Sequence, residues 1–218
     1  MSNFYIQSGY QGKEVGALLF NYPKESLSYS ARDKWAGQTI AGSVEFIEKY
    51  LSPKTPNYYP EFLAPFFKRK IRYIKNLREI EDEECFFAKP ADKHKRFEAQ
   101  MVSGYDNYKD VLYSWQTGPY WISDIVFFRE EWRYYVADGE VLAAYWYSGG
   151  EVEIDPPELN IDWPKDFCGA VDFGCLSTGD IALVENNLPY ACGWYGPYSE
   201  GKVYGEWLEK GFRYLMNE

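Results

Sequence analysis

Three oxygen-bearing side chains with metal-binding chemistry lie close together in the C-terminal half: Asp172, Glu185 and Asn187. Side chains alternate along a strand, so Glu185 and Asn187 point to the same face. The apolar run 181–184 predicts a buried strand, and a partner strand centred on Asp172, returning through the turn-rich segment 174–180, would bring a third ligand beside them. Such a set suits Mg²⁺ carrying a polyphosphate, which points to nucleotide chemistry. An acidic strand edge facing solvent is the alternative interpretation.

Basic side chains that could hold a phosphate occur earlier in the chain. No Walker-type loop and no G-x-G-x-x-G sequence is present, so phosphate would be held by side chains. Lys89 ends the apolar strand predicted at 85–89, where burial is costly unless an anion pairs with it. Lys93 and Lys95 follow in one loop, and Arg133 projects from a predicted strand, opposite to its aromatic neighbours.

Each of these basic residues also has a simpler interpretation. Lys93 and Lys95 fit solvated loop lysines equally well, and Arg133 could pair with Glu130 or Glu131 along its own strand. The single histidine, His94, would be either a general base or a bystander in the same loop. One histidine excludes a zinc site or a Ser-His-Asp triad centred elsewhere.

Composition bounds the class of protein. The 218 residues carry a net charge of −10, which argues against a general nucleic-acid coat, although basic residues gather between 68 and 96. Four widely spaced cysteines, with no C-x-x-C pair and no signal peptide, indicate reduced thiols and a cytoplasmic protein. No apolar run reaches membrane-spanning length. The 20% aromatic content indicates a large core and surfaces able to stack on rings or sugars.

Apolar periodicity and turn residues predict helices and strands without regular alternation, so the expected fold class is α+β. Asp138-Gly139 is a strong two-residue hairpin signal between strands. The predicted elements are a strand at 16–21, a helix at 44–51 capped by Ser43, a proline-rich linker at 52–60, a helical stretch starting at Pro60, and a final helix at 204–216.

These pieces in this order resemble the ATP-grasp superfamily, and within it the short, largely phage-associated clade named for one Arg and two Lys in the active site. The order and spacing of the matching strings make the resemblance fairly specific from about residue 40 onward. The strings are Gly42 to Phe46, Pro56 to Pro60 with Arg69, Phe87-Ala88-Lys89-Pro90, Lys95-Arg96-Phe97, Ser123, Glu131 to Val136, Asp172, Glu185-Asn186-Asn187 and Gly193-Trp194-Tyr195.

The resemblance implies an ATP-grasp fold, in which two α+β lobes enclose a nucleotide and a small pre-ATP-grasp unit precedes them. The corresponding divisions are 1–55 for the N-terminal unit, 56–121 for the central lobe with the phosphate-contacting Lys, and 122–218 for the C-terminal lobe with the hairpin and the metal-ligand strands.

The resemblance also implies roles for single residues. Lys89 and Lys95 match the two Lys, with Lys89 contacting the ATP phosphates, and Arg133 matches the Arg that stabilises the transferring group; Arg133 and Lys95 are the expected catalytic residues. Adenine would meet backbone groups of the interlobe stretch. The stretch is formed by Ser123, Asp124, Ile125 and Val126, and the implied Mg²⁺ ligands are Asp172, Glu185 and Asn187.

The implied activity is an ATP- and Mg²⁺-dependent carboxylate-amine ligase that works through an acyl phosphate, with a small-molecule or peptide acid and an amine or related nucleophile as substrates. The alternatives are a non-catalytic binding module using Tyr- and Trp-rich surfaces, and an ATP-grasp enzyme that modifies a peptide or nucleic-acid terminus. The acidic net charge counts against nucleic acid. A phage-encoded protein in the host cytoplasm fits the clade, and the sequence leaves the oligomeric state open.

Overall fold

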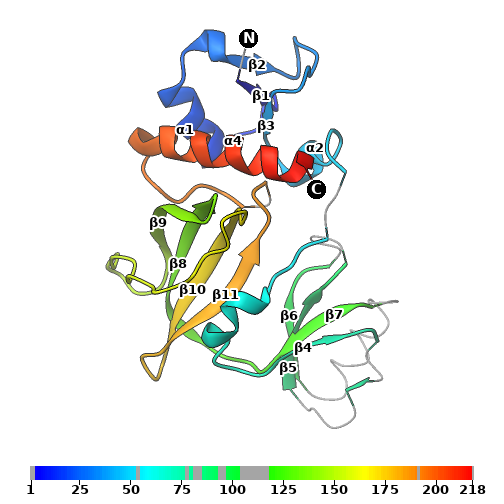
Figure 1. Ribbon diagram of the computed structural model, residues 1–218, viewed down its shortest axis with the longest axis vertical. Coiled ribbons are helices and arrows are strands. Elements are labelled where there is room, and N and C mark those ends of the chain that lie inside the picture. Colours follow the sequence, from blue (N-terminus) through cyan, green and yellow to red (C-terminus); the bar gives the residue numbers. More distant parts are fainter. Residues whose placement is uncertain are drawn as a thin grey trace.

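Three small sheets and one long C-terminal helix make up the chain (Figure 1). The computed structural model describes residues 3–52, 55–76, 79–80, 85–92, 97–103, 118–190 and 192–217. Mixed helices and strands confirm the predicted α+β class.

The N-terminal unit is a three-stranded parallel sheet with strand order β2-β1-β3. Parallel neighbours need a crossover, which α1 provides between β1 and β2. The strand predicted at 16–21 is wrong, because these residues belong to α1, whose apolar positions bury Val15 and Leu18 and leave Phe20 exposed. The elements are β1 (Phe4–Ile6), α1 (Lys13–Asn21), η1 (Lys24–Ser26), β2 (Leu27–Tyr29), β3 (Thr39–Ala41) and α2 (Val44–Ile47).

The predicted helix at 44–51 is shorter in the structure, since α2 ends at Ile47. Its predicted cap is confirmed: the Ser43 hydroxyl accepts a hydrogen bond from the Phe46 N–H, 3.2 Å away. The helical stretch after Pro60 is the 3-10 helix η2 (Glu61–Phe66).

The central sheet is antiparallel, with strand order β4-β7-β5-β6. Alternation along β5 directs Phe86 and Ala88 into the core of this sheet and leaves Phe87 and Lys89 on the other face. The strands are β4 (Ile71–Ile74), β5 (Cys85–Pro90), β6 (Gln100–Ser103) and β7 (Tyr120–Ser123).

The C-terminal sheet is also antiparallel, with order β11-β10-β8-β9. One face of it carries Trp132, Tyr134, Val171, Phe173 and Leu183, which pack against the segment around η2. The opposite face holds the polar residues described below. The strands are β8 (Phe128–Ala137), β9 (Glu140–Ser148), β10 (Gly169–Leu176) and β11 (Ile181–Asn187).

The C-terminal helix α4 (Gly201–Asn217) follows the 3-10 turn η4 (Tyr198–Glu200) and lies between the N-terminal unit and the C-terminal sheet (Figure 1). Its Trp207 is fully buried, and the indole N–H donates to the carbonyl oxygens of Val136 and Gly169. The same core contains Phe4 and Ile6 of β1. The helix predicted at 204–216 is therefore confirmed, and it joins the two ends of the chain in one core.

The hairpin predicted at Asp138-Gly139 joins β8 to β9, and both residues have positive φ, 53° and 73°. We expect Gly139→Ala to destabilise the fold by about 1–2 kcal/mol, since an L-residue is strained at this φ. The added Cβ would also lie 2.8 Å from the Pro164 carbonyl oxygen. Urea unfolding would measure the loss. Gly179→Ala, with φ of 90° and open space, is the matched control, and an equal loss in both variants would contradict the added steric contribution.

Most of the largest buried side chains are aromatic, so the core consumes much of the aromatic content. They include Phe4, Phe86, Tyr120, Tyr135, Phe173, Trp194 and Trp207. Within the described part of the chain, no helix combines the length and the hydrophobicity that a membrane crossing requires.

Candidate functional site

A row of charged side chains crosses three neighbouring strands of the C-terminal sheet. Asp172 of β10 lies directly opposite Glu185 of β11, and Arg133 of β8 lies opposite Asp172 on its other side. Cross-strand partners share a face, so the antiparallel register alone brings the three side chains together. Asn187 follows on the same face, and the partner strand predicted around Asp172 is present.

A β-bulge gives Glu185 its direction. Asp172 pairs with Glu185 but Phe173 pairs with Leu183, so Val184 is the extra residue on β11. Without this insertion, Leu183 and Glu185 would share a face, as residues two apart normally do. The bulge lets Leu183 enter the core while Glu185 joins Asp172 on the polar face.

Arg133 and Asp172 form a bidentate ion pair inside the protein. Nε of Arg133 lies 2.7 Å from Oδ1 of Asp172, and Nη2 lies 2.6 Å from Oδ2. The two residues are 7% and 1% exposed. Burial raises the pKa of Asp172 to about 6 although Arg133 opposes the shift. The predicted alternative partners of Arg133 are wrong, because Glu130 accepts from Trp146 and Glu131 accepts from Tyr147.

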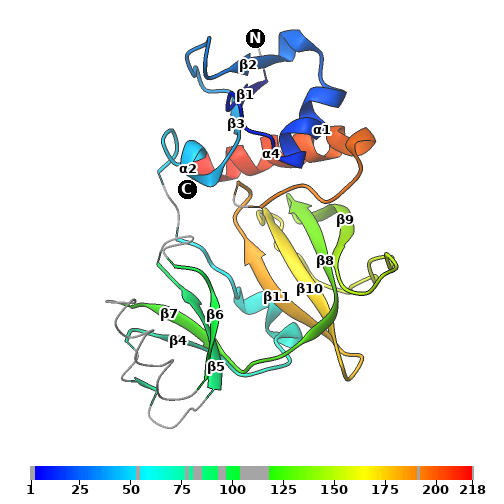
Figure 2. The same ribbon diagram turned by 180° about the vertical axis from the view of Figure 1, so that it is seen from behind.

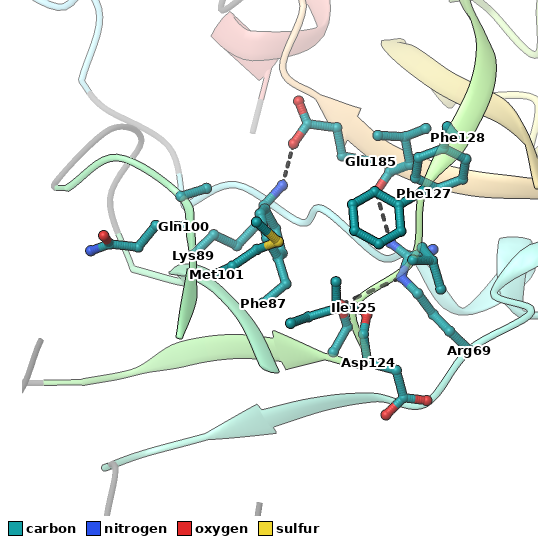
Figure 3. A pocket seen from close by; sticks show the side chains of 14 residues that line it. Arg69, Phe87, Lys89, Gln100, Met101, Asp124, Ile125, Phe127, Phe128 and Glu185 are labelled. Atoms are coloured by element: carbon teal, nitrogen blue, oxygen red, sulfur yellow. Dashed lines mark hydrogen bonds and ion pairs between the residues drawn. The ribbon is translucent and has the colours of Figure 1, made fainter. Parts of the chain in front are cut away.

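Lys89 of the central sheet reaches across to Glu185 of the C-terminal sheet and forms an ion pair with it (Figure 3). Burial alone would raise the pKa of Glu185, but the charge and the hydrogen bond of Lys89 outweigh it and lower this pKa to about 2. The Asn187 amide adds a hydrogen bond, with Nδ2 2.9 Å from Oε1 of Glu185. The same amide nitrogen lies 3.4 Å from Oδ2 of Asp172, so one carboxamide contacts both carboxylates.

Aromatic rings surround the ammonium group of Lys89. Its Nζ lies 4.1 Å from the Tyr58 ring centroid and 5.6 Å from that of Tyr59. Lys89 is 5% exposed, and burial alone would lower its pKa, but Glu185 reverses the shift and raises it above the usual value. The anion that a buried Lys89 requires is therefore Glu185, and the rings stabilise the charge further.

The donor set fits a hard cation. Two carboxylates and one amide gather within hydrogen-bond distance of one another, and Mg²⁺ commonly binds one or two carboxylates together with phosphate oxygens. Among the residues that the structure describes, no group of three His, Cys, Asp or Glu side chains could hold a metal. Asp172, Glu185 and Asn187 would therefore hold Mg²⁺ only together with phosphate or water oxygens.

A cavity of about 500 Å³ opens beside the Lys89–Glu185 pair (Figure 3). One wall comes from the connection between the central and C-terminal sheets, that is Ser123, Asp124, Ile125 and Val126. The other walls come from both sheets, and include Arg69, Phe87, Met101, Phe128 and Val184. The predicted interlobe stretch thus lines the same cavity as Lys89 and Glu185. A second cavity, of about 400 Å³, shares Lys89 and Glu185 and adds Tyr58 and Asn187.

One predicted site residue is not placed. Lys95, with Lys93 and His94, lies outside the described residues, so its position relative to Lys89 stays a prediction. The other predicted residues come together: Arg133, Asp172, Glu185, Asn187 and Lys89 form one connected network.

Sequence reasoning missed the aromatic side chains beside the cations. Tyr147 and Tyr195 stack with centroids 4.7 Å apart, and the Arg133 guanidinium lies 4.9 Å from the Tyr195 centroid. Tyr195 lies in a matching string, but no role follows from that string alone. The Tyr58-Tyr59 pair between two prolines was the available signal for rings next to Lys89.

Structure comparison identifies the class of fold as ATP-grasp. An ATP-grasp RimK domain protein from Sphaerobacter thermophilus is similar over 97% of this chain and 99% of its own, with a TM-score of 0.56 at 10% identity. D-cycloserine synthetase DcsG is similar over 94% and 99%, with a TM-score of 0.52 at 12% identity. The chain spans about half the length of the ATP-grasp ligase PsnB, covering 54% of it and 68% of itself, at 13% identity and a TM-score of 0.40.

The family is narrower than the fold. A family model of the ATP-grasp domain, family 2 of the clade named for one Arg and two Lys, matches residues 66–201, which is more than half of the chain. The chain therefore belongs to this family, and family and fold together support an ATP-dependent ligase as the class of enzyme. No curated protein matches the chain.

Proposed function

We propose that the chain is an ATP- and Mg²⁺-dependent ligase that joins a carboxylate to an amine or a related nucleophile. The observation that carries the proposal is the convergence of Lys89, Arg133, Asp172, Glu185 and Asn187 beside the interlobe cavity. Two cations and two carboxylates beside such a cavity match the needs of a metal-bound triphosphate. Family membership supports ATP as the nucleotide.

The nucleotide would lie with its base in the 500 Å³ cavity. Backbone groups of residues 123–126 would meet the adenine edge, and apolar walls from Phe87, Met101 and Phe128 would cover its faces. The phosphates would then reach Lys89, and we assign Lys95 as the second lysine on the phosphates. Residues 1–55, 56–121 and 122–218 serve in this proposal as the N-terminal unit and the two lobes.

Asp172, Glu185 and Asn187 are the proposed Mg²⁺ ligands, and the ion would neutralise phosphate charge and orient the terminal phosphoryl group. The substrate carboxylate attacks the γ-phosphorus, the bond to the β-phosphate oxygen breaks, and ADP leaves. The amine then attacks the acyl phosphate carbon and releases phosphate. Arg133 would stabilise the negative charge on the transferring group, because its guanidinium carries a fixed charge that needs no proton exchange.

Such chemistry asks little covalent work of the protein, since positioning and charge stabilisation supply the catalysis. The acids and amines proposed are small molecules or peptide ends. The cytoplasm is the proposed setting, of the host where a phage encodes the protein. The four free cysteines are compatible with a reducing compartment.

Calorimetry with a non-hydrolysable ATP analogue tests the proposal. We expect binding in the presence of Mg²⁺ and a clear loss of affinity in EDTA. Release of ADP and phosphate with panels of acids and amines would then identify the substrates. Absence of analogue binding with Mg²⁺ would overturn the ligase proposal and favour a binding module.

A further inference from the structure

The strand that carries Glu185 and Asn187 is the edge of its sheet. In the order β11-β10-β8-β9, β11 has one strand neighbour, β10. An edge strand exposes backbone groups that need other partners. The segment 57–69, here called the strap, runs beside this edge and includes η2 (Figure 1, Figure 2).

The strap holds the β11 edge at two places, one on each side of Glu185. On the C-terminal side, the Asn186 N–H donates to the Tyr58 carbonyl over 2.9 Å, and the Asn186 amide donates to the Asn57 carbonyl over 2.8 Å. On the N-terminal side, Arg69 reaches the backbone at the bulge. Glu185 therefore lies between two fixed points.

Arg69 uses most of its hydrogen-bonding capacity on this edge and its surroundings. Nη1 lies 2.6 Å from the Leu183 carbonyl oxygen, and Nη2 lies 3.2 Å from that of Val184. Further bonds go from Nη1 to the Phe67 carbonyl and from Nε to the Ser123 hydroxyl, at 3.3 and 3.4 Å. A guanidinium has five N–H donors, so these four bonds leave little capacity for a ligand phosphate.

The backbone before Arg69 takes an unusual conformation that turns the chain here. Lys68 has a φ of 48°, in the left-handed region that non-glycine residues seldom occupy. Such a residue persists where its surroundings over-determine it, and these sites cluster at functional positions. The turn separates the strap from β4 and leaves Arg69 beside the bulge on β11.

We propose that Arg69 is a positioning residue: it holds the Val184 bulge in the form that directs Glu185 toward the metal and phosphate site. The bulge decides which face Glu185 occupies, and the two carbonyl groups that Arg69 binds belong to the bulge residue and the one before it. Arg69 also lines the nucleotide cavity and binds Ser123 at its wall. It thereby ties the metal-binding strand to the nucleotide cavity.

This inference rests on the proposed function, because it gives Glu185 the role of a metal ligand. It predicts that Arg69 acts on the Mg²⁺-dependent part of nucleotide binding. A residue that contacts the nucleotide directly would change affinity by the same factor with and without Mg²⁺.

The test measures the dissociation constant of a non-hydrolysable ATP analogue across a series of free Mg²⁺ concentrations and in EDTA. We expect Arg69→Ala to keep the wild-type affinity in EDTA and to need about 10–100 times more Mg²⁺ for the same gain, the range typical when support of a metal ligand is lost. Methylguanidinium at low concentration should restore part of the gain. Arg69→Lys should fall between wild type and Arg69→Ala, because one ammonium reaches fewer carbonyls.

The outcomes separate the two proposals. Wild type that shows no Mg²⁺-dependent binding would overturn the proposed function itself. An Arg69→Ala protein with the wild-type Mg²⁺ dependence, or with equal losses in Mg²⁺ and in EDTA, would overturn the positioning role while leaving the ligase intact. Circular dichroism checks the fold of each variant, and Arg69→Lys carries the test if Arg69→Ala does not fold. Arg213→Ala, on the exposed side of α4, is the matched control and should behave as wild type.

Discussion

Replacing Lys89 by methionine is expected to weaken binding of a non-hydrolysable ATP analogue by about a hundredfold or more, a loss typical for a charged group aimed at an anion in a water-poor site. The ammonium group is 5% exposed and lies at the junction of the two cavities. Methionine keeps much of the side-chain length and removes the charge. Calorimetry in excess Mg²⁺ measures the effect, with Lys24→Met, an exposed lysine in η1, as the control.

The same substitution leaves Glu185 without its cation, so stability should also fall, by about 1–3 kcal/mol. Adding Glu185→Gln to Lys89→Met should recover part of this loss, because the unpaired carboxylate is then removed. A double-mutant cycle by urea unfolding separates this coupling from the two single effects. Nucleotide affinity should stay low in the double variant. Wild-type affinity in Lys89→Met would rule out Lys89 as a phosphate contact.

Local signals predicted the elements whose sequences agree with their surroundings. The Asp138-Gly139 turn, the strands on either side of it and the final helix all follow from turn chemistry and apolar periodicity. The neighbouring strands β10 and β11 likewise followed from two apolar runs separated by turn residues.

The N-terminal unit shows where such reasoning ends. A short apolar run such as 16–21 fits a strand or a helix equally well, and only tertiary packing selected α1. The three-residue strands β1, β2 and β3 are too short for alternation to identify. Their parallel pairing depends on contacts between segments far apart in the chain.

The site was predicted as a set of residue types and missed as a set of pairs. The sequence indicated two carboxylates, an amide, a lysine and an arginine, but the register of β8 against β10 determines that Arg133 meets Asp172. The Val184 bulge is likewise invisible to a period-two pattern, because it is the exception to that period. Arg69 was noted as part of a string, and its contacts to β11 arise only from the folded strap.

Substituting Asp172 by asparagine should produce the largest loss of stability, about 3–5 kcal/mol, because it leaves the Arg133 charge buried and unpaired. For a chain of this size each kcal/mol lowers Tm by about 2–4 °C, so the melting temperature should fall by roughly 6–20 °C. Differential scanning calorimetry measures this shift. Arg133→Met should cost a similar amount, since it leaves the Asp172 carboxylate, 1% exposed, without its guanidinium.

The double variant Arg133→Met with Asp172→Leu separates structure from function. Replacing a buried ion pair by apolar side chains of similar volume is often neutral or stabilising, so this protein should regain most of the lost stability. If the pair serves ATP chemistry, Mg²⁺-dependent analogue binding and turnover should stay lost although the fold is restored. A double variant with wild-type stability and wild-type nucleotide binding would instead make Arg133–Asp172 a structural pair only, and the Mg²⁺ site would need other ligands than Asp172.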